Sequence, residues 1–351
     1  MFQRKTGIFC LLISLALGPL AVGHQGHSAV SEEMVQAAQV FLKSLDAELR
    51  QQATFDFDSP VRTDWHFIPK DRVGVMLKEL NLEQRRAAHA FMQTALSNKG
   101  YLKAVAVMSL ESVLRELERD KPDAAERRDQ EKYWFSIFGE PQSEEPWGWR
   151  VEGHHLSLNF SSIHGLVVST PMFFGANPAE IKTGPRAGLR VMGREETIAR
   201  KLVNALNASQ REQAVIATEA PSDVITGPGQ EIDLGDPVGL PAAEMTDMQA
   251  KLLGHLIYEY ATNLRLELAH GELRSIYDKG AENIHFAWAG GLEPGDGHYY
   301  RIHGSTFIIE YDSTQNDANH IHTIWHSLTD DFALDTLRRH YAETPHEQKD
   351  E

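Results

Sequence analysis

One strand-like phrase occurs twice in the chain, and this repeat constrains the fold more than any other feature of the sequence. Trp147–Phe160 and His298–Tyr311 share an aromatic-rich pattern in which Arg150 aligns with Arg301 (301 − 150 = 151). The same offset of 151 residues aligns two further stretches, 133–139 and 284–290. The repeat predicts two copies of one unit related by a pseudo-twofold arrangement.

Apolar residues at helical spacing predict helices before each copy of the phrase. The expected helices are 31–52, 72–79, 82–97 and 101–119 in the first half, and about 194–207, 209–220 and 245–277 in the second. Alternation of large and polar residues predicts strands after them, at 133–138, 147–160, 283–289 and 298–311. Residues 221–241, rich in Gly, Pro and Asp, predict a long loop.

A helical phrase supports the same duplication. Leu followed by Asp or Asn opens three similar stretches, at Asp46, Asn81 and Asn207, and each of these side chains suits the N-cap of a helix. We therefore expect an α+β fold in one body, 24–351, made of two repeats at about 31–160 and 194–312 and a His-rich C-terminal segment at 313–344. A helical domain with an inserted sheet would have the same elements without a twofold axis.

The first 23 residues have the pattern of a secretory signal peptide. Arg4 and Lys5 precede an apolar run, and the small residues of 21–23 fit a cleavage site before His24. A retained membrane anchor is the alternative, but the small-residue ending favours removal. We expect an exported protein, periplasmic or extracellular. An amino terminus at His24 would add an amine that can chelate copper, although a simple chain end explains the same residues.

Charge and cysteine content narrow the classes of partner and ligand. The net charge of −16 becomes −18 once Arg4 and Lys5 are removed, which disfavours nucleic acid and anionic membranes as partners. Cys10 is the only cysteine, so residues 24–351 have neither a disulfide nor a thiolate ligand. A metal ion would have to be bound by His, Asp or Glu. The sequence has no phosphate-binding glycine loop and no nucleophile elbow, so no nucleotide cofactor is expected.

Histidines in and after the repeated phrase are the main candidates for chemistry. On an ideal strand Glu152 and His154 share one face while His155 lies on the other, so both histidines can bind one metal only if a bulge intervenes. His298 opens the second copy of the phrase. A single histidine in a strand is more often a hydrogen-bonded structural residue than a ligand.

The densest cluster is Gln315–Trp325, which contains His320-Ile-His322. In an extended chain His320 and His322 lie on the same side, spaced to share an ion, whereas a helix would instead pair His322 with His326. Asn316 and its neighbours suit either turn formation or the orientation of a ring nitrogen. Together with His154, His155 and His298, the cluster predicts a His-dominated metal site.

Four stretches resemble an exported bacterial family catalogued as domain of unknown function 3500. They are 152–159, 170–178, 298–302 and 316–322, and the resemblance extends over nearly all of 24–351. It implies no established activity. The family pattern has a neutral amide in place of His303 and Arg in place of His326, which ranks both below the other five histidines as ligands.

The leading hypothesis is an exported metalloenzyme that acts on a small molecule by metal-assisted hydrolysis or oxidation. The expected metal is zinc, copper or iron, because imidazoles suit these ions. We expect His320, His322 and His154 or His155 as ligands. His298 would bind or support the metal, and Glu152 would act as general base or orient a ligand. The alternative is a binding protein in which Arg150, Arg301 and Asn316 contact a ligand at the repeat junction, although an ion pair with a strand neighbour is the more common role for each Arg.

Overall fold

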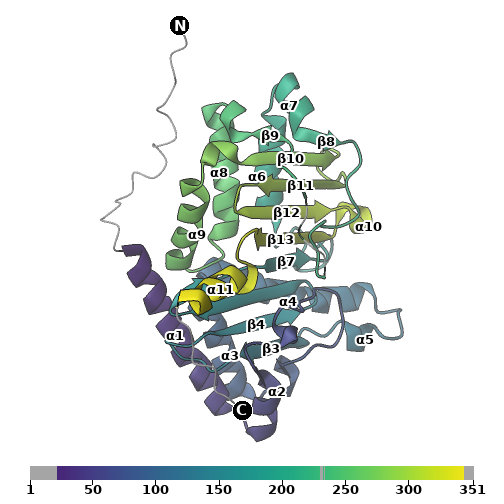
Figure 1. Cartoon of the computed structure of the whole chain (residues 1–351). Coiled ribbons are helices and arrows are strands. Elements are labelled where there is room, and N and C mark those ends of the chain that lie inside the picture. Colours follow the sequence, from purple (N-terminus) through teal and green to yellow (C-terminus); the bar gives the residue numbers. More distant parts are fainter. Residues whose placement is uncertain (1–21, 230–231, 233, 344–351) are drawn as a thin grey trace.

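The computed structural model describes residues 22–229, 232 and 234–343 (Figure 1). The expected signal peptide therefore lies almost wholly outside the described residues, as do the side chains of 22–28, including His24. The described residues form a mixed α+β structure with eleven α-helices and one large mixed sheet. None of the described helices is both long and apolar enough to cross a membrane.

Most helices lie in two sets, one before each set of strands. The helices are α1 Val22–Ser44, α2 Ala47–Ala53, α3 Leu82–Ala95, α4 Asn98–Leu117, α5 Ala124–Arg127, α6 Gly193–Asn204, α7 Ala208–Ala214, α8 Asp247–Ala261, α9 Leu266–Asp278, α10 Gln315–Ala318 and α11 Leu334–Glu343. Short 3-10 turns are η2 Pro60–Arg62, η3 Leu77–Glu79, η4 Ala242–Glu244, η5 Ala281–Asn283 and η6 Asp331–Ala333. The helix expected at 72–79 is wrong, because that segment contains a short strand and η3.

The three expected N-caps are confirmed. The side-chain oxygens of Asp46, Asn81 and Asn207 each accept a hydrogen bond from a backbone N–H in the first turn of α2, α3 and α7. These bonds satisfy donors that a helix start leaves without a partner in the helix.

The sheet has the order β1-β3-β4-β5-β7-β13-β12-β11-β10-β8, and β2, β6 and β9 pair with β3, β5 and β10. The strands are β1 Thr54–Phe55, β2 Val75–Met76, β3 Tyr133–Phe138, β4 Trp147–Gly153, β5 Leu156–Ile163, β6 Leu166–Val168, β7 Met172–Ala176, β8 Val215–Ala217, β9 Leu240–Pro241, β10 His285–Gly290, β11 His298–His303, β12 Phe307–Ser313 and β13 Ile321–Ser327. In the middle β7 pairs with β13, antiparallel, and Phe173 lies opposite Ile324.

Each copy of the repeated phrase forms two strands and not one. A two-residue turn at His154 and His155 joins β4 to β5, and a gap at 304–306 separates β11 from β12. The expectation of one continuous strand at 147–160 is therefore wrong. The turn decides where the two histidines point.

The two faces of the sheet differ in polarity, as the alternation of side chains predicts. Trp147 and Trp149 in β4 pack against Phe91 of α3, and the Tyr300 hydroxyl of β11 lies 2.6 Å from that of Tyr260 in α8, so this face meets the helices. The opposite face carries Arg150, and aromatic residues of the loop before β2 cover part of it, with Phe67 stacked on Phe173 at 4.2 Å. We call it the loop face.

Candidate metal centre

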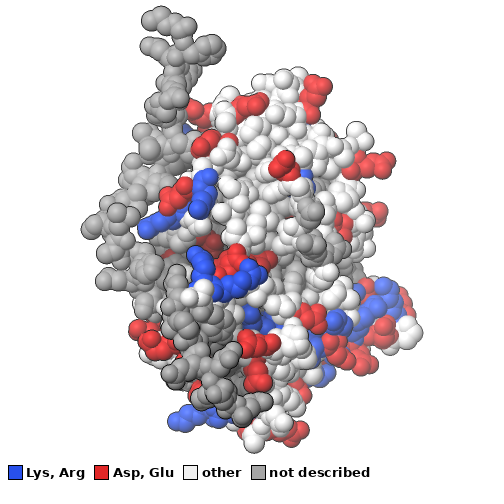
Figure 2. Space-filling model, in the orientation of Figure 1, with Lys and Arg blue, Asp and Glu red and all other residues white. Residues whose placement is uncertain are grey.

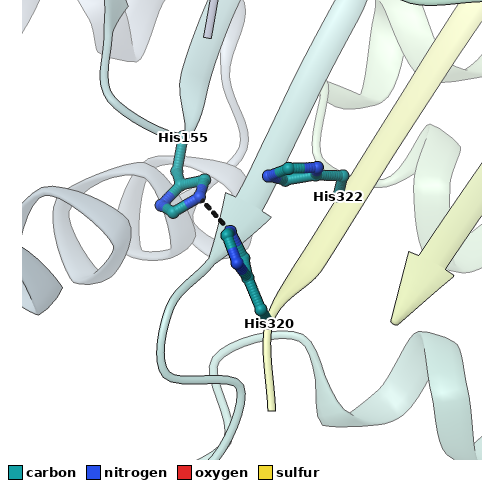
Figure 3. Close-up of side chains that lie close together, drawn as sticks. All are labelled: His155, His320 and His322. Carbon is teal, nitrogen blue, oxygen red and sulfur yellow. Dashed lines mark hydrogen bonds between the residues drawn. The ribbon is translucent and has the colours of Figure 1, made fainter. Parts of the chain in front are cut away.

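Three buried imidazoles converge where the β4–β5 turn approaches β13 (Figure 3). His155 comes from the turn, His320 immediately precedes β13, and His322 lies within it. The Nε2 atoms of His155 and His320 lie 2.7 Å apart, and one nitrogen from each of the three rings lies within 4.8 Å of the others. This group, the histidine triad, can hold a metal ion.

The backbone of His155 takes an uncommon conformation to bring its ring into the triad. Its φ of 63° lies in the left-handed region, which residues other than Gly, Asn and Asp rarely adopt. The His155 N–H donates to the carbonyl of Phe67 at 2.9 Å, and its carbonyl accepts from the N–H of Gly175 at 2.8 Å. The turn is fixed on both sides, so alternation along an ideal strand does not apply to His154 and His155.

Gly175 leaves the space that the His155 ring needs. A Cβ atom at this position would lie 2.8 Å from the ring Cδ2 of His155 and 2.8 Å from the carbonyl oxygen of Ile321. Real Cβ atoms do not approach other heavy atoms so closely. Only glycine at position 175 therefore permits the observed approach of the hairpin to β13.

The His320-Ile-His322 stretch is extended, as the same-side interpretation predicts, and not helical. A tight turn precedes it, in which Asn316 and the next two residues have φ values of 53°, 55° and 57°. Asn tolerates this left-handed conformation. Asn319 then fixes the start of β13, because its side-chain oxygen accepts a hydrogen bond from the Glu180 N–H at 2.8 Å.

Burial favours the neutral forms of His155 and His320. It lowers the pKa of His155 well below the ordinary value, and the nearby ring of His154 lowers it further. Burial, followed by the influence of His322, lowers the pKa of His320 to about 3. A neutral imidazole has a nitrogen lone pair, which is the form that binds a metal.

A carboxylate orients the third ring. Asp223 Oδ1 lies 2.6 Å from His322 Nδ1, an arrangement that places the proton on Nδ1 and leaves Nε2 as the free nitrogen. Burial opposes ionisation of Asp223, but the interactions with His322 and the hydrogen bond from the Val224 N–H together outweigh it and hold the pKa of Asp223 below its usual value. The loop that carries Asp223 is itself fixed, because the Glu310 carboxylate accepts from the N–H groups of Ile225 and Thr226 at 3.2 and 2.9 Å.

A second group of buried side chains lies beside the triad. Glu111 of α4, His154 and His155 also bring one ligand atom each within 4.8 Å of the others. Glu111 Oε1 is hydrogen bonded to His154 Nδ1, and the rings of His154 and His155 are 3.7 Å apart between centroids. Among the side chains that the structure describes, these are the two groups of His, Asp and Glu able to hold an ion.

A cavity of about 270 Å³ reaches this second group from the surface. Glu111 and His154 line its inner end, and Lys70, Arg127 and Lys132 are among the charged residues around it. Figure 2 shows Lys, Arg, Asp and Glu intermingled at the lower right, where Figure 1 places α5. The entrance is therefore polar and carries charges of both signs.

The structure places Glu152 apart from both groups. Its carboxylate lies 2.8 Å from Arg150 Nε and 3.3 Å from Arg72 Nε, and it accepts from the His66 N–H at 3.1 Å. Glu152 is thus engaged in a buried ion-pair network on the loop face. Arg150 has the ion-pair role that the sequence allowed as its alternative.

His298 is also separate from the triad. In the register of β13, β12 and β11, His322 lies opposite Asp312 and Asp312 lies opposite Tyr299, so the adjacent His298 points to the other face of the sheet. There its ring stacks on Trp288 at 4.8 Å. Burial is the main reason that the pKa of His298 falls to about 4.

The other predicted contact residues do not gather in one place. Arg150 and Arg301 lie in β4 and β11, five strand spacings apart, or roughly 24 Å at about 4.8 Å per spacing. One small ligand cannot contact both. The Asn316 side chain donates to Asn177 at 3.4 Å, which fits its role in the turn before β13.

Sequence reasoning missed Glu111 and Asp223. Glu111 lies among the buried positions of α4, between Leu110 and Leu114, so a charged residue within an apolar helix face was a usable signal. Asp223 lies in a loop rich in Gly, Pro and Asp. No local pattern distinguishes it from its neighbours there.

The family comparison agrees with the resemblance in the motifs. The family described as "Protein of unknown function (DUF3500)" matches residues 27–334. The chain belongs to this family. No curated protein and no solved structure matches the chain. The matched range includes all of the residues in both groups, and the family's description assigns them no role.

Proposed function

We propose that this protein is an exported metalloenzyme in which His155, His320 and His322 bind a divalent metal ion. The observation that carries the proposal is the convergence of three buried imidazoles from segments 165 residues apart, with ligand atoms within 4.8 Å of one another. Structural histidines usually pair with carbonyls, carboxylates or aromatic rings. Here Nε2 of His155 faces Nε2 of His320 at 2.7 Å, within hydrogen-bonding distance (Figure 3), and one ion bound by both nitrogens would account for this pairing.

The strained turn at His155 supports a functional role. A non-glycine residue at φ 63° costs about 1 kcal/mol or more, and Gly would avoid that cost. Such strain persists mainly at functional sites. A role of the ring as metal ligand would explain why position 155 is His and not Gly, in spite of this cost.

Zinc-assisted hydrolysis fits the centre best. Three nitrogen ligands leave a position for a water molecule, and zinc lowers the pKa of that water to about 7. The hydrogen bond between His322 Nδ1 and the Asp223 carboxylate is an arrangement common in zinc sites. The cavity that Glu111 and His154 line brings a small molecule from the surface to the group beside the triad. Copper or iron in the same ligands would instead support an oxidation, and this is the alternative reaction.

Elemental analysis of protein purified without an affinity tag tests the proposal. We expect bound zinc, copper or iron in the natural protein and a lower metal content in the two ligand variants His320→Ala and His322→Ala. His255→Ala is the matched control, because His255 is exposed on α8. Metal content that is the same in all four proteins, or absent from all, would contradict the proposal.

We also propose that the two halves of the chain are copies of one unit. The sheet order is the same read from either edge, with β1, β3, β4, β5 and β7 corresponding to β8, β10, β11, β12 and β13. Phe173 and Ile324 lie opposite each other and differ by 151 residues (324 − 173), the offset of the repeated phrase. A twofold axis that passes between Phe173 and Ile324 would relate the two halves. An experimental structure whose halves fail to superpose by a rotation near 180° would contradict this.

Only one half would carry the centre. At the offset of 151 residues, His154 and His155 correspond to Ser305 and Thr306 in the second half. We therefore expect one centre per chain, close to the middle of the sheet.

Export is a separate proposal, which rests on residues 1–23. Cell fractionation with mass determination of the mature protein tests it, and a cytoplasmic protein with its first 23 residues intact would contradict it.

A further inference from the structure

The second group of ligands contains a buried carboxylate oxygen that lacks a partner. Glu111 is 2% exposed, and its Oε1 is bonded to His154. No hydrogen-bond donor among the described residues reaches its Oε2. A buried charged oxygen without a donor carries the full cost of its lost hydration. The carboxylate therefore points to a cation that approaches Oε2.

Arg128 is close to this oxygen but does not satisfy it. Its Nη1 lies 4.0 Å from Glu111 Oε2, beyond hydrogen-bonding distance, and 3.1 Å from His154 Nδ1. The rest of the guanidinium is bound to Glu118, through Nε at 2.9 Å and Nη2 at 3.1 Å. Arg128 is thus anchored by Glu118 and contacts His154, and Glu111 Oε2 keeps no hydrogen-bond donor.

The group is accessible from outside. Glu111 and His154 line the cavity of about 270 Å³, which is large enough for an ion with several water molecules. The residues that line this cavity do not include His155, His320 or His322. An ion that enters this cavity therefore meets Glu111 and His154.

We propose that the centre binds a second metal ion, held by Glu111, His154 and His155. This inference rests on the proposed triad site, with which it shares His155. An imidazole has two ring nitrogens, so His155 can bind both ions as an imidazolate, after its remaining N–H proton is released to solvent. Two imidazoles and one carboxylate suit iron(II), zinc or manganese, whereas the all-nitrogen triad suits zinc or copper.

The two positions can be separated by variants, because His320 belongs only to the triad and Glu111 only to the second group. Metal-free protein is titrated with zinc, and bound zinc is counted by elemental analysis after removal of free ions. We expect two equivalents in the natural protein, one in Glu111→Gln, one in His320→Ala and none in His155→Gly. Circular dichroism and thermal unfolding of each metal-free variant check that it is folded.

The outcomes distinguish the two proposals. One equivalent in the natural protein and in Glu111→Gln, with none in His320→Ala, would overturn the second ion and keep the triad site. No zinc in any variant would overturn both. Arg128→Met serves as a further check, because removal of a positive charge 4.0 Å from Glu111 should tighten the second ion selectively. A second equivalent that appears only in Arg128→Met would mean that the arginine itself fills the position, and this also overturns the proposal.

Discussion

His155 and His298 are both buried, and the pKa values of both are lowered mainly by burial, yet their surroundings differ. The His298 ring stacks on Trp288, and Nδ1 lies 2.9 Å from the Asp296 carbonyl. The His155 ring instead faces two other imidazoles (Figure 3). Burial and a lowered pKa therefore do not mark a ligand by themselves. The direction of the ring nitrogens and the identity of their neighbours do.

The strongest test of this comparison removes each ring in turn. His155→Gly should abolish metal binding while it relieves the left-handed strain at φ 63°, so the variant stays folded. His298→Phe should keep the stack on Trp288 and bind metal as the natural protein does. Zinc content by elemental analysis measures both. Equal loss in the two variants would remove the distinction between the two histidines.

The position of His155 depends on Gly175, and this gives the second test. Gly175→Ala should lower the free energy of unfolding by about 1–3 kcal/mol, because the new Cβ overlaps the His155 ring and the Ile321 carbonyl. It should also weaken zinc binding by displacing the ring. Gly227→Ala is the control, since the nearest atom to its Cβ would be 3.9 Å away. Urea unfolding and zinc titration report the two effects, and unchanged values for Gly175→Ala would show that β13 and the hairpin adjust freely.

A smaller effect is expected from the carboxylate that orients His322. Asp223→Asn keeps the shape of the side chain but loses the charge bound to Nδ1, and we expect zinc affinity to fall about 10–100-fold. Asp236→Asn, an exposed change in the same loop, should have no effect. Competition with a chelator of known affinity measures the difference. Equal affinities would mean that His322 keeps its orientation without Asp223.

The smallest effect concerns pH and His298. Its pKa is about 4 in the folded chain and about 6.5 in the unfolded chain, so the unfolded state binds more protons between these values. The stability contributed by neutral His298 is therefore complete above about pH 6.5 and falls as the pH decreases towards 4. His298→Phe should reduce this loss by about 1–3 kcal/mol. Chemical unfolding of both metal-free proteins at several pH values measures how the free energy of unfolding depends on pH. If that dependence is the same in the natural protein and in His298→Phe, His298 is not the cause of the loss.

The sequence predicted the parts of the centre that depend on local periodicity. His320 and His322 lie two residues apart in an extended segment, so their common side followed from strand geometry. Residues 133–138 and the caps at Asp46 and Asn207 were likewise predicted from local patterns and are confirmed. Each of these features depends on only a few neighbouring residues.

The parts that depend on the path of the chain were not predictable in this way. The turn at His154 and His155 interrupts the strand pattern, and its geometry follows from hydrogen bonds to Phe67 and Gly175, far away in sequence. Glu111 and Asp223 reach the histidines from a helix and a loop whose positions no local pattern gives. Glu152 seemed suited to catalysis because its charge stood beside His154, but its arginine partners come from other elements of the fold.

The centre joins parts of the chain that are otherwise remote, since 165 residues separate His155 from His320. An ion bound there would act as a removable staple in a chain whose only cysteine is Cys10. A permanent cross-link across a loop of that length would contribute about 5 kcal/mol through the entropy of the unfolded chain. Loss of the ion, to a chelator or to acid, would then loosen the seam between β7 and β13 first, so that the supply of metal would set how long the folded protein persists.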